Sequence, residues 1–254
     1  MNRMILFQSC RRLAWALIFG VAASAAPLAD TNLSGDYEVA GQTSNGRAYT
    51  GQMKIVARGE GYAIAWRLDE GGAYRGLAIK MDNVLGAVYW PVKDPLHGHG
   101  IVAYHIEGGE LQGIWLVAGG TQKTGRETLK GSPDLAGEYQ ITLGENPDDM
   151  TNYGGRVRME RRGDHYRVSW YTPGLSYIGN GIRIGDVLVV GYALGEAPGT
   201  VGYCVGNDGL RGVWTYGSQV ELGRESLKRG AQDTQPAPES SEPVGCQLPQ
   251  SGGQ

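Results

Sequence analysis

The sequence predicts an all-β protein made of two similar eight-stranded antiparallel up-and-down barrels in tandem. Residues 111–131 (LQGIWLVAGGTQKTGRETLKG) return almost verbatim at 210–230 (LRGVWTYGSQVELGRESLKRG), which indicates a duplicated unit. Runs rich in Val, Ile, Tyr and Trp alternate apolar with polar residues, a pattern typical of strands with one buried face. Hairpin-length gaps join them into a meander, which loses its exposed edges by closing into a barrel. Two meander β-sandwiches are the alternative.

The duplication defines the predicted domains. The first repeat spans residues 33–131 and opens with Leu33-Ser-Gly35-Asp-Tyr37, and the second spans residues 135–230 and opens with Leu135-Ala-Gly137-Glu-Tyr139. Because only residues 132–134 separate them, we expect two docked barrels, one from each repeat.

The strands of the first repeat can be read in order after the opening segment. Alternating apolar rows occupy residues 53–57, 62–66, 77–81, 85–89, 102–106 and 111–117, and a last segment at 126–129 completes the set. Turn signals such as Arg58-Gly59-Glu60-Gly61 and Glu107-Gly108-Gly109-Glu110 separate the rows. This spacing predicts about eight strands in roughly 100 residues.

The outline resembles the calycin group, the lipocalin and avidin type of small barrel. Tyr37 and Tyr139, each in a Gly-x-Tyr, stand where those families carry Gly-x-Trp in the first strand. Arg126 and Arg224 stand where the families carry an Arg that packs across that ring. The resemblance implies closed up-and-down barrels, although Tyr replaces Trp and the repeats are shorter than most lipocalins.

The chain ends carry two further predictions. Residues 1–26 are predicted to be an export signal, with Arg3, Arg11 and Arg12 before an apolar stretch and Ala23-Ser24-Ala25 as a cleavage site. The alternative is an uncleaved anchor. Residues 231–254, rich in Pro, Ser, Gln and Glu, are predicted to be a disordered tail. We therefore expect a periplasmic or secreted protein without a transmembrane span after signal removal.

The charge balance limits the classes of binding partner, and the two cysteines outside the predicted signal leave two possible pairing states. Without the three signal arginines, the acidic residues outnumber the basic ones, which argues against nucleic acid as a partner. Cys204 and Cys246 either form a disulfide that ties down the tail or remain one buried and one free thiol. A small-molecule ligand or an envelope protein is the expected partner.

Aromatic residues common to both repeats are the candidate ligand-binding residues: Trp66, Tyr89, Trp115, Trp170, Tyr192 and Trp214. Such rings either fill the barrel or line a cup that grips an apolar or sugar-like ligand. Glu127 and Glu225 share a strand face with Leu129 and Leu227, so each needs a buried donor, such as a Tyr hydroxyl or an Arg. They are interpreted as an end-of-barrel network, with ligand contact or a joint acid/base role as alternatives.

A cluster unique to the first repeat is the candidate metal site. Asp94, His97, His99 and His105 fall within twelve residues, and imidazoles are good ligands for zinc or copper. The alternative is an exposed polar loop. The oxygen-rich stretch at residues 145–152 is interpreted as a turn, because it lacks the calcium-loop spacing.

No Gly-x-Ser-x-Gly, phosphate loop or dinucleotide fingerprint occurs, so catalysis is the minority hypothesis. The leading hypothesis is a non-catalytic binding protein that holds a small apolar or glycan-like ligand at a barrel mouth. The alternatives are a structural or protein-interaction component of the cell envelope with filled barrels, and a metal carrier or metal-dependent activity.

Overall fold

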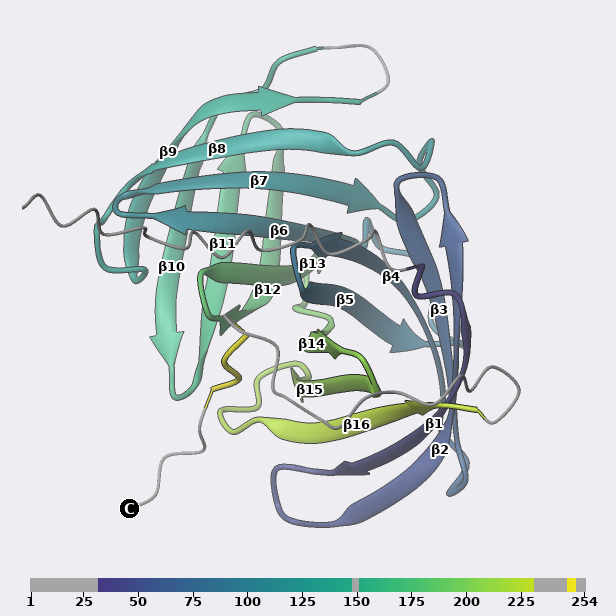
Figure 1. Ribbon diagram of the computed structural model, residues 1–254. Helices are drawn as coiled ribbons and strands as arrows, with labels where there is room; N and C mark the ends of the chain where they lie inside the picture. Colours follow the sequence, from purple (N-terminus) through teal and green to yellow (C-terminus); the bar gives the residue numbers. More distant parts are fainter. Residues whose placement is uncertain (1–31, 148–150, 231–245, 250–254) are drawn as a thin grey trace, which may run out of the picture. The chain divides into compact units, whose positions relative to one another are not determined.

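The computed structural model describes residues 32–147, 151–230 and 246–249, which form sixteen β-strands in two closed antiparallel barrels (Figure 1). The all-β class and the two eight-stranded barrels predicted from the sequence are thereby confirmed. The predicted export signal at 1–26 lies outside the described residues. No helix that could cross a membrane is found in the described part of the chain.

One barrel, called the terminal barrel here, takes its strands from both ends of the described chain. Its strands are β1 (Gly35–Gln42), β2 (Ala48–Arg58), β3 (Gly61–Leu68), β4 (Ala73–Met81), β5 (Val84–Pro91), β14 (Gly199–Gly206), β15 (Gly209–Thr215) and β16 (Gly223–Arg229). They close in the order β1-β16-β15-β14-β5-β4-β3-β2.

The other barrel, the central barrel, is formed by the middle of the chain. Its strands are β6 (Gly100–Glu107), β7 (Glu110–Val117), β8 (Gly125–Gly131), β9 (Gly137–Glu145), β10 (Arg156–Arg162), β11 (His165–Thr172), β12 (Leu175–Ile184) and β13 (Val187–Leu194). They close in the order β10-β11-β12-β13-β6-β7-β8-β9.

The two barrels do not coincide with the two sequence repeats. β5 pairs with β14, and β6 pairs with β13, so each repeat gives five strands to one barrel and three to the other. The expectation that residues 33–131 and 135–230 each close a barrel was therefore wrong. Because β6 and β14 are copies of one strand, either can complete the edge beside β5, and exchanging copies is a low-cost rearrangement.

The exchange is accompanied by an apolar core between the barrels. β5 and β13 are buried on both faces over most of their length, where alternation predicted one wet face. Val88 and Val189 belong to this core, and a Cβ on Gly86 would overlap the Val189 side chain. Strands buried on both faces carry continuous apolar runs, and the runs VLGAVYW and VLVVGYA are of that kind.

Inside the barrels, aromatic rings lie over glycines of the neighbouring strand. Tyr89 is paired with Gly199 and Trp214 with Gly223, and a Cβ on either glycine would overlap the ring. Glycine is thus required where a ring lies flat across the next strand, and the chain contains 42 glycines.

Buried side chains fill one end of each barrel, beside the start of β1 in the terminal barrel and of β9 in the central barrel. In the terminal barrel the Tyr37 hydroxyl donates to the Leu33 carbonyl at 2.8 Å, and both side chains are buried. Arg229, rather than the expected Arg224, lies across the Tyr37 ring at 5.4 Å and donates to its hydroxyl. The register explains the correction, because Tyr37 pairs with Arg229 whereas Arg224 pairs with Gln42 at the other end of β1.

In the central barrel the register places Gly131, rather than an arginine, opposite the first-strand tyrosine. This tyrosine, Tyr139, is buried and pairs with Gly131, while Arg126 pairs with Glu145 and is exposed. The Tyr139 hydroxyl donates to the carbonyls of Ser132, at 3.0 Å, and Leu135, and the ring packs in the core of the central barrel. Among the described residues, an arginine thus lies across the first-strand tyrosine in the terminal barrel but not in the central barrel.

The C-terminal segment is attached to the body by a disulfide between Cys204 and Cys246. Gly185 of the central barrel donates to the Gln247 carbonyl at 3.2 Å, and Leu248 packs against the core between the barrels. Residues 246–249 are therefore ordered, contrary to the prediction of disorder throughout 231–254. The remaining residues of that range lie outside the described part.

Candidate functional site

Each barrel opens into an aromatic cup at the end opposite its filled floor. The cup of the terminal barrel, the terminal cup, has a volume of about 370 Å³, and that of the central barrel, the central cup, about 710 Å³. The six predicted ligand-binding residues all line them: Trp66, Tyr89 and Trp214 the terminal cup, and Trp115, Trp170 and Tyr192 the central cup. The sequence left open whether the barrels were filled or hollow, and each is filled at one end and open at the other.

The rings of the terminal cup form a contiguous wall. Tyr89 lies 5.7 Å from Trp66 and 5.7 Å from Tyr74 between ring centroids, with the Tyr74 contact edge-on at 88°. Tyr49 and Trp214 meet edge-on at 6.3 Å. Such tilted and edge-to-face contacts stabilise the rings in place.

The central cup repeats this wall at the equivalent positions. Tyr192 lies 5.5 Å from Trp170 and 5.5 Å from Tyr177, and Trp115 meets Tyr153 at 6.3 Å. Tyr49, Tyr74, Tyr153 and Tyr177 were not among the predicted site residues. Their recurrence at equivalent places in the two repeats was the signal that could have identified them.

A buried glutamate lies at the base of each cup. Glu225 on β16 is 8% exposed and accepts hydrogen bonds from the hydroxyls of Tyr49, at 2.9 Å, and Tyr203. Tyr203 on β14 is buried beneath the terminal cup and pairs across the strands with Gly212. The sequence led us to expect either a Tyr hydroxyl or an Arg as the donor to this glutamate, and the Tyr hydroxyl is the one observed.

Glu127 on β8 occupies the equivalent place in the central cup and is 4% exposed. It accepts hydrogen bonds from Trp170 Nε1 at 3.1 Å, the Tyr153 hydroxyl at 3.1 Å and the Tyr104 hydroxyl. The two glutamates lie in different barrels, each within its own set of donors. They do not form the joint acid/base pair that the sequence left open.

Burial sets the ionisation of these groups. It raises the pKa of Glu225 and of Glu127, because an apolar environment disfavours the charged form, and the hydroxyl and indole donors only partly oppose this. Burial, followed by the nearby Glu225, also raises the pKa of Tyr203 well above its usual value. Tyr203 is therefore a neutral donor at physiological pH.

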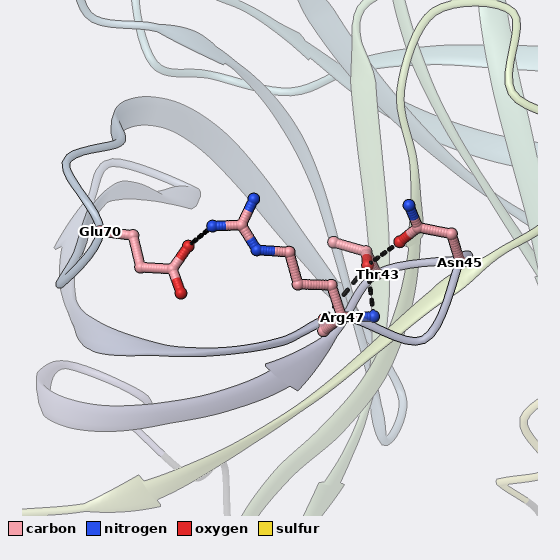
Figure 2. Close-up of polar contacts among 4 residues, drawn as sticks. All are labelled: Thr43, Asn45, Arg47 and Glu70. Carbon is pink, nitrogen blue, oxygen red and sulfur yellow. Dashed lines mark hydrogen bonds and ion pairs between the residues drawn. The ribbon is translucent and has the colours of Figure 1, made fainter.

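The rims of the two cups differ although their walls match. Arg47, in the β1–β2 turn, and Glu70, in the β3–β4 turn, form an ion pair at the rim of the terminal cup (Figure 2). Thr43 braces the same turn by donating to Asn45 and accepting from the Arg47 amide at 3.0 Å. Thr151 and Gly174 stand at the matching places of the second repeat, so this pair has no central counterpart.

Each rim also receives support from the opposite barrel. The Glu60 amide of the terminal barrel donates to the Gln122 carbonyl at 3.0 Å, and its carboxylate accepts from the Thr124 amide at 2.8 Å. His165 Nδ1 of the central barrel lies 3.2 Å from the Val220 carbonyl oxygen in the terminal rim loop. The β7–β8 and β15–β16 loops beside the cups are thus fixed from outside their own barrel.

Of the histidines predicted as metal ligands, His97 and His99 lie side by side, whereas His105 lies apart in a contact of its own. His105 pairs with Asp82 at 2.9 Å, whereas the His99 ring is buried and stacks on Trp90 at 4.5 Å. His99 Nδ1 accepts the His97 amide at 3.1 Å, and burial lowers the pKa of His99. Within residues 32–147, 151–230 and 246–249 no group of three or more His, Cys, Asp or Glu side chains could hold a metal ion. The predicted His97–His99–His105 site is not assembled.

The oxygen-rich loop of the second repeat forms part of the central rim. Asn146 donates from its amide to the Thr151 carbonyl at 3.0 Å and from its side chain to the Thr151 hydroxyl at 2.8 Å. Those bonds are typical of the turn that was predicted. Residues 148–150 of this loop lie outside the described part.

No protein-family model matches the chain, and a comparison with curated proteins finds no significant match.

Proposed function

We propose that this chain is an exported, non-catalytic binding protein that holds a small apolar or glycan-like ligand in the aromatic cup of each barrel. The observation that carries the proposal is the recurrence of one open cup, with equivalent rings and an equivalent glutamate, in both barrels. Rings that served only to fill a barrel would leave no such space at either mouth.

The chemistry of the cups favours binding over catalysis. Volumes of about 370 and 710 Å³ are in the usual range for small-molecule sites, which are mostly apolar with a few polar groups that orient the ligand. Each cup has one buried carboxylate, and tyrosine hydroxyls already hydrogen-bond to both of its oxygens. A second acid or base for proton transfer is not among the described lining residues of the terminal cup, where Glu70 is bound to Arg47.

The proposal includes a calycin-like mode of binding, in which the ligand enters the open end of an up-and-down barrel. Support comes from the closed eight-stranded architecture and from the first-strand Tyr37 with Arg229 across its ring. The exchange of strands between repeats is a departure from a simple tandem of such barrels.

A fluorescent neutral probe tests the proposal. N-phenyl-1-naphthylamine represents apolar ligands, and a short oligosaccharide followed by tryptophan fluorescence represents glycans. We expect saturable binding of at least one, weakened by Tyr74→Ala and Tyr177→Ala, since each removes a ring from one cup wall. The matched control is Tyr171→Ala, because Tyr171 is 47% exposed and lies outside both cups.

Saturable binding that Tyr171→Ala weakens as much as Tyr74→Ala and Tyr177→Ala would place the ligand elsewhere. Absence of binding by either probe class would oppose a receptor for neutral ligands.

A further inference from the structure

The terminal cup contains a buried carboxylate with only neutral partners. Glu225 lines the cup, and the groups that hydrogen-bond to it are all neutral: the hydroxyls of Tyr49 and Tyr203 and the indole of Trp66. Buried carboxylates in proteins are ordinarily paired with a cation, because an isolated charge is costly to remove from water. The counter-charge of Glu225 is therefore missing from its immediate surroundings in the described chain.

The space above Glu225 is enclosed by aromatic rings. The Tyr89 ring lies 5.7 Å from the rings of both Trp66 and Tyr74, between centroids, and Tyr49 and Trp214 form a second ring contact. The face of an aromatic ring is negative, so several rings around one space attract a cation, above all a weakly hydrated ammonium. Rings and carboxylate thus favour the same kind of charge.

The rim leaves this charge unbalanced. Arg47 is the cationic side chain among the described lining residues of the terminal cup, and it is bound by Glu70 (Figure 2). The pair is neutral as a whole, so no free cation among the described lining residues balances Glu225 when it is ionised. The rim of the central cup carries the exposed Lys123, whose charge would repel a cation entering there.

We propose that the terminal cup binds an organic cation, a small molecule whose protonated or quaternary ammonium group lies among Trp66, Tyr89 and Trp214 and pairs with Glu225. This inference rests on the proposed binding function and gives the ligand class for one of the two cups. The central cup, with Lys123 at its rim, is expected to prefer neutral ligands.

A comparison of choline with its uncharged isostere 3,3-dimethylbutan-1-ol isolates the contribution of charge. The two molecules share shape and hydroxyl group and differ in a nitrogen replaced by carbon. Isothermal titration of the whole protein should show choline binding at least tenfold more tightly than the alcohol. Glu225→Gln keeps the side-chain shape and removes the charge, so the ratio should fall toward one, whereas Glu110→Gln, outside both cups, should leave the ratio unchanged.

Equal affinity for the two molecules in the unmodified protein would overturn the inference and leave a neutral cup, as the proposed function alone requires. Failure of both molecules to bind would also overturn it, and the neutral fluorescent probe would then decide separately whether the cups bind ligands. A choline preference that persists in Glu225→Gln and disappears in Glu127→Gln would place the cation in the other barrel. The isostere comparison needs no variant, so it stands even if a substitution impairs folding.

Discussion

Tyr49 and Glu225 belong to different sequence repeats, and the Tyr49 hydroxyl donates to Glu225 Oε2 at 2.9 Å inside one barrel. The same holds in the central barrel, where Glu127 of the first repeat accepts from Trp170 of the second. Neither repeat therefore contains a complete cup. Each cup is assembled by the exchange of three strands between repeats, so both cups depend on strands from both repeats.

Substitution of the glycines beneath the rings should destabilise the fold. Gly223→Ala places a Cβ within the ring of Trp214, and overpacking of this kind costs about 1–3 kcal/mol. Gly154→Ala is the control, because a Cβ there meets no atom within 4 Å. Urea denaturation monitored by circular dichroism should show a lower midpoint for Gly223→Ala alone. Equal midpoints would contradict the ring–glycine contact.

The buried glutamates should make stability depend on pH. Burial raises the pKa of Glu225 and Glu127 in the folded chain, so the folded protein holds these protons more tightly than the unfolded one. The corresponding stability is present below the unfolded glutamate pKa of about 4.3 and is lost as the pH rises through the folded value. The double variant Glu127→Gln/Glu225→Gln should therefore gain stability relative to the unmodified protein as the pH rises from 4 toward 8, roughly the interval above that unfolded value.

Melting temperatures of both proteins across this interval provide the measurement. His99 and His165, whose pKa values burial lowers, act in the opposite direction in both proteins, so their effect cancels in the difference. Glu110→Gln serves as a surface control, because the pKa of Glu110 is lowered by its contact with Lys130. If the melting temperatures of the double variant and the parent differ by the same amount at every pH, the pKa values of Glu127 and Glu225 are not raised in the folded protein.

The disulfide should stabilise the protein through the loop it closes. Cys204 and Cys246 are 42 residues apart, and a crosslink over such a loop contributes typically about 2–4 kcal/mol. Cys204→Ala/Cys246→Ala should unfold at correspondingly lower denaturant, and reduction should lower the stability of the parent alone. Without the disulfide, limited proteolysis should cut after Cys246. In the intact protein this segment is held in place, because the Gln247 carbonyl accepts a hydrogen bond from the Gly185 amide. Unchanged stability on reduction would contradict a structural role.

Much of the fold was predictable because local signals and the duplication agree. Alternation located the strands, and the matching of Trp66 with Trp170 and Trp115 with Trp214 identified cup residues. The three histidines predicted as metal ligands are not brought together, because His105 lies apart from His97 and His99 although it is near them in sequence. His105 lies on β6 and faces Asp82 of the other barrel, while His99 packs on Trp90.

The strand exchange could not be predicted by pairing rules, because the two candidate partners of β5 are near-copies of each other. What the exchange adds is contact between the second faces of β5 and β13, where Val88 and Val189 lie in the core between the barrels. The continuous apolar runs of β5 and β13 carried that information. When these runs are interpreted as alternating strands, the number and type of barrels are predicted correctly, but each barrel is wrongly assigned to a single repeat.

The most direct test of a binding site shared between repeats is a crosslink between β1 and β16. Glu38 and Lys228 are exposed partners in the register, whereas closure of the first repeat on itself would place Glu38 beside Lys130. In a Cys10→Ser background at low protein concentration, we expect a short thiol crosslinker to join Glu38→Cys with Lys228→Cys efficiently within one chain, and Glu38→Cys with Lys130→Cys poorly. The reverse yields would show that each repeat closes its own barrel and its own cup.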